Sequence, residues 1–174
     1  KYREVFTFPI EDYYKRVGFD FDKIPFSMLA HEYMEDYQEK SYACDLHSDV
    51  LDVVNKAKNL GFSQTVLSAS KMDYLLKQME TLHVDDLFDS IYGINDIYAK
   101  SKVELAHAFK QTCSQDDEIY FVGDSVHDYE VAKSIGAKCI LVTTGHQNRA
   151  TLESVNVPVM DSLMESLDLI YERD

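Results

Sequence analysis

The sequence lacks several features that membrane and secreted proteins require. No apolar run in its 174 residues approaches the roughly 20 residues needed to cross a bilayer. The opening residues, Lys1-Tyr2-Arg3-Glu4, are not followed by the apolar core of a signal peptide. The three cysteines, Cys44, Cys113 and Cys139, are odd in number and form no CxxC pair. Scattered thiols of this kind are typical of a reducing compartment, so we expect a cytoplasmic protein.

Basic residues are also scarce. The chain has 17 Lys and Arg against 31 Asp and Glu, a formal net charge of −14. Because an acidic surface repels phosphate backbones and anionic lipids, neither nucleic acid nor a membrane surface is an expected partner. Some carboxylates are candidates to hold a divalent cation, and the rest are expected to form a solvated surface. The apolar share of 45% and the length suit one compact domain, or one domain with a modest insertion.

The segment from Lys1 to about Tyr42 has a helical pattern. Its apolar residues recur at three- and four-residue spacing and form one stripe: Phe26, Leu29, Ala30, Tyr33, Met34 and Tyr37. The stretch Gly18–Pro25 begins and ends with helix-breaking residues and is predicted as a loop. We therefore expect a small group of helices here.

From about Leu46 onward, short β-rich runs alternate with amphipathic segments. The predicted strands are Thr65–Leu67, Ser90–Tyr92, Ile119–Val122, Cys139–Thr143 and Val157–Met160. The predicted helices are Asp49–Asn59, Lys71–Leu82, Lys102–Thr112, Val126–Ile135 and Asp161–Tyr171. This alternation predicts an α/β, Rossmann-like fold of three layers, in which helices cover both faces of a mostly parallel sheet. Such sheets bind ligands at the carboxyl ends of their strands.

One strand end carries two acids. After the predicted strand Ile119–Val122 comes Gly123-Asp124-Ser125-Val126-His127-Asp128, where Gly123 permits a tight turn. Asp124 and Asp128 offer the hard oxygen ligands that suit Mg²⁺. The alternative is that Asp124 or Ser125 only caps the following helix, which is common for these residue types.

The wider pattern around these acids resembles a known family. Gly123-Asp124 and Asp128 are followed by Ala132, Gly136, Ile140, Val142 and Gly145. This string is similar to the fourth motif of the haloacid dehalogenase superfamily, whose metal-binding acids follow a GDxxxD pattern. The resemblance implies that Asp124 and Asp128 hold Mg²⁺.

The same resemblance implies two phosphate-binding residues. Ser68 follows the predicted strand Thr65–Leu67 and matches the superfamily's phosphate-binding hydroxyl. The superfamily's lysine has two candidates, and Lys102 is favoured over Lys100 because Ser101-Lys102-Val103-Glu104 fits a capping box that places Lys102 in the first turn of a helix. A cation is unfavourable there, so an anionic site is expected to hold it. Ser70 is assigned instead to the start of the next helix, in a capping-box-like Ser70-Lys71-Met72-Asp73.

Residues 1–43 resemble part of the superfamily's small helical cap, and residues 44–174 resemble its core. The string Phe8–Phe21 is similar to caps of phosphoglycolate-phosphatase-like proteins. The superfamily's first motif, a DxD that supplies the nucleophile, is imitated only by Asp20-Phe21-Asp22, which follows no buried strand. Since the sequence also lacks an initiator Met, we expect the first, central strand and the nucleophile to lie outside these residues. Either such a segment supplies the strand, or another copy of the chain fills the gap by homo-oligomerisation or strand exchange.

These expectations combine into one hypothesis. The complete protein is expected to hydrolyse small phosphorylated metabolites with Mg²⁺, while these 174 residues alone are expected to be inactive. The alternatives are a phosphomutase or pyrophosphatase on the same fold, or a non-catalytic binding or regulatory module. His127 and His146 are further candidates to reach the pocket, and the substrate stays open.

Overall fold

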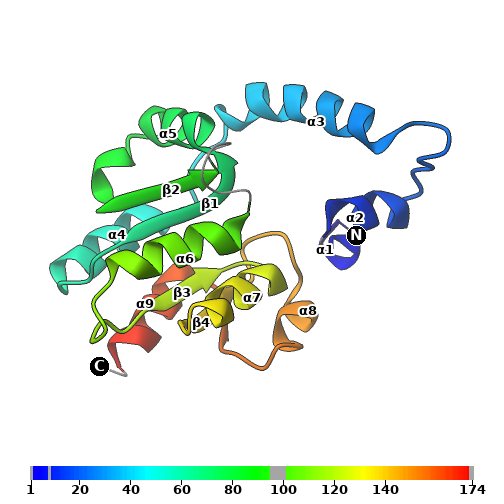
Figure 1. Ribbon diagram of the computed structural model, residues 1–174. Helices are drawn as coiled ribbons and strands as arrows, with labels where there is room; N and C mark the ends of the chain where they lie inside the picture. The colour runs from blue at the N-terminus through cyan, green and yellow to red at the C-terminus, as the bar shows by residue number, and fades with distance from the viewer. Residues whose placement is uncertain (1, 8, 95–100, 173–174) are drawn as a thin grey trace.

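The computed structural model describes residues 2–7, 9–94 and 101–172 (Figure 1). Its strands are β1 (Thr65–Lys71), β2 (Ser90–Ile94), β3 (Tyr120–Gly123), β4 (Lys138–Val142) and β5 (Val159–Met160). Its helices are α1 (Tyr2–Val5), α2 (Ile10–Arg16), α3 (Phe26–Ser41), α4 (Val50–Asn59), α5 (Met72–Thr81), α6 (Lys102–Thr112), α7 (Val126–Ser134), α8 (Arg149–Glu153) and α9 (Leu163–Tyr171), with a 3-10 turn η1 (Asp85–Leu87). Every strand pair in these ranges is parallel, which confirms the predicted α/β class.

The strands form two sheets. β1 pairs with β2, while β3, β4 and β5 form a second sheet in that order. Within the described ranges β1 and β3 do not pair with each other. Each of these two strands therefore has one edge without a strand partner in the described part of the chain. The sequence predicted the alternation of strands and helices correctly, but the division into two sheets depends on which edges meet.

Three strands differ in length from their predictions: β1 and β2 end later than expected, and β5 begins later. β5 begins at Val159 although the apolar run starts at Val157, because Pro158 has no N–H to donate to a ladder. The Pro158 carbonyl still accepts a hydrogen bond from the Leu141 N–H at 2.9 Å. β1 continues past Leu67 to Lys71 through an irregularity in its pairing with β2.

This extension of β1 corrects the predicted role of Ser70. Ser70 lies in β1 and does not cap α5, whose N-cap position is Lys71 with no side-chain hydrogen bond. The Ser70 N–H donates instead to the Ser68 hydroxyl oxygen at 3.1 Å. The local pattern favoured a cap, but strand pairing through Lys71 placed the helix start one residue later than the capping pattern requires.

The helices hold the two sheets together. α6 packs on both strands of the β1–β2 sheet and on α7, which covers β3 and β4. On the other side α4 packs against α9, and α9 contacts β3, β4 and β5. Ala106 of α6 and Val131 of α7 are fully buried and pack with partly buried Leu67 of β1 and Phe121 of β3. The core is therefore continuous across the two sheets through the helices.

The amino-terminal helices stand partly away from this core. Figure 1 shows α3 running from α4 toward α1 and α2, which lie beside the loop that follows β4. The apolar stripe predicted for α3 is largely exposed, since Tyr33, Met34 and Tyr37 keep 54%, 41% and 44% of their surface accessible. No helix in the described ranges combines the length and apolar character needed to cross a membrane.

Candidate active site

The turn between β3 and α7 is organised by a capping box. The Asp128 N–H donates to the Ser125 hydroxyl oxygen at 3.2 Å. In return Asp128 Oδ2 accepts from the N–H groups of Asp124 and Ser125, both at 3.0 Å, and from the Ser125 hydroxyl at 2.7 Å. A Cβ at Gly123 would lie 2.3 Å from the Asp128 Cβ, so this position requires glycine. The helix-capping alternative is thus realised by Ser125, with Asp128 as its partner.

The second oxygen of Asp128 binds Lys102. The Lys102 Nζ lies 2.5 Å from Asp128 Oδ1, with side chains that are 19% and 4% exposed. The ammonium also lies 5.6 Å from the centre of the Phe121 ring. Burial by itself raises the Asp128 pKa, but Lys102 and the hydrogen bonds from Ser125 and the Asp124 backbone outweigh it and hold that pKa below its ordinary value. The anion that the sequence required beside Lys102 is Asp128.

Asp124 has one carboxylate oxygen available for a ligand. Its Oδ2 accepts a hydrogen bond from the His146 N–H at 2.6 Å. The described residues donate no hydrogen bond to its Oδ1. A Cβ at Gly145 would lie 1.9 Å from Asp124 Oδ2, so the loop after β4 can approach this carboxylate only with glycine there.

His146 connects this carboxylate to the amino-terminal helices. Its ring Nδ1 lies 2.8 Å from the Tyr2 hydroxyl, and the ring stacks on Phe6 at 4.8 Å between centroids. Arg3 adds hydrogen bonds to the carbonyl oxygens of Thr143 and Thr144 at 2.9 and 3.0 Å. Helix α1 is therefore attached to the same loop that contacts Asp124.

The environment of Tyr2 keeps its hydroxyl protonated. Desolvation raises the pKa of Tyr2 to about 12, with smaller contributions from Tyr13, Tyr33 and Asp124. The protonated hydroxyl can therefore donate a hydrogen bond to Nδ1 of His146.

Gln147 supports the site and was not predicted from the sequence. It is only 4% exposed, and its Oε1 accepts a hydrogen bond from the Val126 N–H at 2.7 Å. That N–H belongs to the first turn of α7 and has no partner within the helix. A polar residue two positions after Gly145, at a strand end, was the signal that could have identified it.

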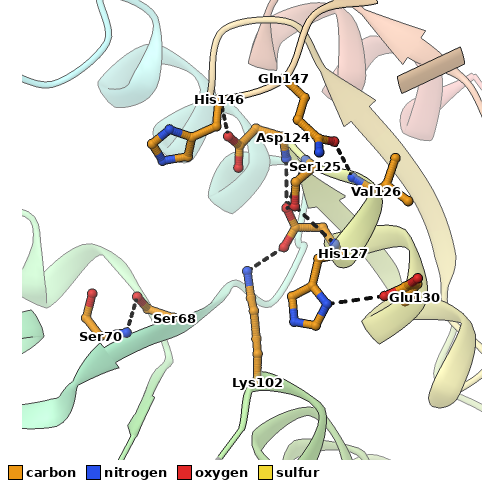
Figure 2. Close-up of polar contacts among 11 residues, drawn as sticks. Ser68, Ser70, Lys102, Asp124, Ser125, Val126, His127, Glu130, His146 and Gln147 are labelled. Carbon is orange, nitrogen blue, oxygen red and sulfur yellow. Dashed lines mark hydrogen bonds and ion pairs between the residues drawn. The ribbon is translucent and has the colours of Figure 1, made fainter. Parts of the chain in front are cut away.

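The structure brings three of the four predicted site residues into one network. Lys102 binds Asp128, which in turn accepts a hydrogen bond from the Asp124 N–H. Figure 2 shows the Lys102 side chain directed toward the turn that carries Asp124 and Ser125, while Ser68 lies on the β1 side. The Ser68 hydroxyl accepts from Ser70 and makes no hydrogen bond to Lys102 or Asp124. His127 Nδ1 lies 3.3 Å from Glu130 Oε2.

The sequence contains two less favoured site candidates, Lys100 and the stretch Asp20-Phe21-Asp22. Lys100, the alternative to Lys102, lies outside the described residues. The stretch Asp20-Phe21-Asp22 lies in the turn between α2 and α3, with both acids exposed. There the Asp22 N–H donates to Asp20 Oδ1 at 3.1 Å, and Lys23 pairs with Asp20. This stretch is not at the carboxyl end of a described strand.

The donor set of the network fits a cation at Asp124 only. Nowhere in the part of the chain that the structure describes do three or more His, Cys, Asp or Glu side chains gather as a metal site. Both oxygens of Asp128 are engaged by protein donors. Among the described residues of this network, Asp124 Oδ1 is the carboxylate oxygen that accepts no hydrogen bond, so it is the one available to bind a hard cation. The Lys102 ammonium is bound to Asp128 instead.

Comparison with known families places this α/β chain among the haloacid dehalogenase-like hydrolases. The chain matches that family over residues 1–142 and belongs to it. This confirms the resemblance found in the sequence.

Two curated proteins and one solved structure are similar to this chain. The chain is 26% identical over 127 residues to PpaX of Caldanaerobacter subterraneus, assigned as a pyrophosphatase, covering 70% of this chain and 57% of that protein. It is 23% identical over 139 residues to phosphoglycolate phosphatase 1 of Pseudomonas aeruginosa, covering 78% and 51%. The chain thus spans little more than half the length of these curated relatives. A haloacid dehalogenase-like hydrolase from Streptococcus pneumoniae superposes with a TM-score of 0.80 at 20% identity, covering 93% of this chain and 76% of that one.

Proposed function

We propose that the complete protein is a Mg²⁺-dependent phosphatase of small phosphate monoesters. The observation that supports this most directly is the buried pair of Lys102 and Asp128 beside Asp124, which places a cation and a free carboxylate oxygen at one strand end. Family membership and the phosphoglycolate phosphatase of Pseudomonas aeruginosa support the same reaction class. In this proposal residues 1–43 form part of a cap over the core of residues 44–174.

The roles follow from the contacts. Asp124 would hold Mg²⁺ through Oδ1, and the ion would offset charge on the phosphoryl oxygens. Lys102, oriented by Asp128, would hold a phosphoryl oxygen, and Ser68, in the middle of β1, would donate a hydrogen bond to it. Asp128 acts mainly through Lys102 and the α7 turn, because its oxygens are already bound. An aspartate outside these 174 residues would attack phosphorus, displace the alcohol of the ester and form an aspartyl-phosphate, which water then cleaves to inorganic phosphate and the free aspartate.

Hydrolysis of p-nitrophenyl phosphate by the complete, gene-encoded protein tests this proposal. We expect turnover with Mg²⁺ and none with EDTA. Asp124→Asn and Lys102→Met should each lower kcat at least about a hundredfold, in line with the loss of a charge-stabilising group. Asp168→Asn, a surface acid paired with Lys56, is the matched control and should leave kcat unchanged. Turnover by the 174-residue chain alone would contradict the external nucleophile.

A non-catalytic binding module is the second candidate. It is favoured by the engagement of both Asp128 oxygens and by the lack of a three-residue metal cluster in the ranges the structure describes. If this candidate is right, the complete protein binds inorganic phosphate in calorimetry but releases no p-nitrophenol. The two candidates are thus separated by binding and turnover measured on the same sample.

A further inference from the structure

The amino-terminal helix α1 depends on tertiary contacts for its position. It has only four residues, and a helix of that length is not stable on its own in water. Phe6, directly after it, is buried, whereas no other residue from 2 to 53 whose burial the structure describes is. The Phe6 ring packs on Tyr13 and on His146, at 5.5 and 4.8 Å between ring centroids. The loop after β4 therefore supplies part of the surface that holds α1 in place.

Hydrogen bonds attach α1 to the same loop at several points. The Arg3 guanidinium donates to two successive carbonyl oxygens, those of Thr143 and Thr144, at 2.9 and 3.0 Å. The side-chain amide of Asn148 donates to the Arg3 carbonyl oxygen at 3.1 Å. Contacts with α1 thus extend along the loop from Thr143 to Asn148. The position of α1 and the path of the loop backbone therefore depend on each other.

The loop in turn holds the Asp124 carboxylate. The His146 N–H donates to Asp124 Oδ2 at 2.6 Å, and the described residues donate no other hydrogen bond to this carboxylate. In Figure 2 the hydrogen bond from the His146 backbone reaches Asp124, while the imidazole ring extends away from the turn that carries this acid. A carboxylate that is held at one oxygen presents the other in a defined direction. One residue, His146, therefore joins α1 through its ring to Asp124 through its backbone.

The direction of the His146 N–H is sensitive to the contacts around it. The preceding residue is Gly145, and its lack of a side chain leaves the backbone there free to rotate. What holds the chain on either side of this glycine therefore decides where the N–H points. Arg3 binds the carbonyl oxygen just before the glycine, and Phe6 stacks on the His146 ring just after it. Gln147 also ties the loop to the start of α7, but from the far side of His146.

We propose that α1 positions the Asp124 carboxylate through His146. Tyr2 and Phe6 are the positioning residues, because they contact the His146 ring. With α1 docked, Oδ2 of Asp124 is held and Oδ1 is presented to a cation; with α1 released, Oδ2 loses its donor and the carboxylate is free to turn. Docking of α1 and binding of Mg²⁺ then strengthen each other, since a coupling between two sites acts equally in both directions. The coupling to Mg²⁺ rests on the proposed function, whereas the positioning itself does not.

Amide exchange measured by NMR on the complete, gene-encoded protein without Mg²⁺ tests the positioning. Tyr2→Phe removes only the hydroxyl that contacts His146 Nδ1, and Phe6→Ala removes the stacked ring. We expect the His146 amide to exchange about threefold faster in the first variant and about tenfold or more faster in the second. Tyr171→Phe, at a tyrosine that is 58% exposed at the end of α9, is the matched control and should leave this exchange unchanged. Unchanged exchange in all three variants would overturn the proposal, because Gln147 would then hold the loop without α1.

Calorimetry with Mg²⁺ separates positioning from a merely structural role of α1. Tyr2→Phe should bind Mg²⁺ about three- to tenfold more weakly than the wild type, and Tyr171→Phe should bind it equally well. In the wild type, Mg²⁺ should also slow exchange of the Phe6 amide, which donates to the Tyr2 carbonyl oxygen at 3.0 Å, by a similar factor. In Asp124→Asn, Mg²⁺ should leave that exchange unchanged.

The two measurements give separable outcomes. Faster His146 exchange with an unchanged affinity for Mg²⁺ would refute the positioning role, since α1 would then only stabilise the loop. A wild type that binds no Mg²⁺ would instead contradict the proposed function, and the exchange rates measured without Mg²⁺ would then decide the positioning by themselves.

Discussion

Breaking the buried Lys102–Asp128 pair by replacing one partner should cost far more folding stability than breaking an exposed pair of the same length. Lys102 and Asp128 approach to 2.5 Å with side chains 19% and 4% exposed. Lys56 and Asp168 also approach to 2.5 Å, but they are 44% and 51% exposed. Removing one partner of a buried pair leaves an unpaired charge in a poorly solvated site, which costs about 3–5 kcal/mol. An exposed pair is worth about 0–1 kcal/mol.

Two double-mutant cycles measure this difference. Lys102→Met, Asp128→Asn and their combination form the first, and Lys56→Met, Asp168→Asn and their combination form the second. Urea unfolding followed by far-UV circular dichroism gives the free energy of unfolding for each. We expect a coupling energy of about 2–3 kcal/mol in the first cycle and below about 1 kcal/mol in the second. Equal coupling energies would refute the argument that burial, not distance, determines the strength of the pair.

Three further predictions follow from the same site. Gly145→Ala should displace the Asp124 carboxylate, because the new Cβ would lie 1.9 Å from Oδ2, and calorimetry should show weaker Mg²⁺ binding; unchanged binding would contradict the role of Asp124. Ser125→Ala should lower the free energy of unfolding by about 2 kcal/mol, because the buried Ser125 hydroxyl donates to Asp128 Oδ2 and accepts from the Asp128 N–H. Ser162→Ala, at the N-cap of α9, should lower it by at most about 1 kcal/mol. The Asp128 pKa is lowered in the folded state, so the stabilisation by this carboxylate is present in full above the ordinary aspartate pKa of about 3.9 and is lost as the pH falls through the lower folded pKa. At pH values below about 4, the urea concentration at the unfolding midpoint should therefore decrease more steeply with falling pH for the wild type than for Asp128→Asn.

The helices and strands of the core were predictable because local signals agree. The α6 range was predicted without error, since Ser101 accepts a hydrogen bond from the Glu104 N–H at 3.3 Å as the capping pattern requires. β4 was predicted within one residue at each end because its apolar run is continuous. α8 was missed, since its five residues are too few for a periodic pattern.

The candidate site was predictable only in its chemistry. The sequence marked Asp124, Asp128, Ser68 and Lys102, and it required an anion near Lys102. It could not identify that anion, because Lys102 and Asp128 are 26 residues apart and meet only when α6 packs on α7. The contact between Tyr2 and His146 spans 144 residues and has no local signal at all.

By itself, the sequence determined the α/β class, the order of the strands and of the longer helices between them, and the acidic turn after β3, since each depends on interactions between residues a few positions apart. Only the tertiary structure decided that both oxygens of Asp128 are bound, that Gln147 supports the start of α7, and that β1 and β3 belong to separate sheets in the described part of the chain. These features depend on the approach of distant segments, which side-chain packing between helices and sheets controls and local periodicity does not.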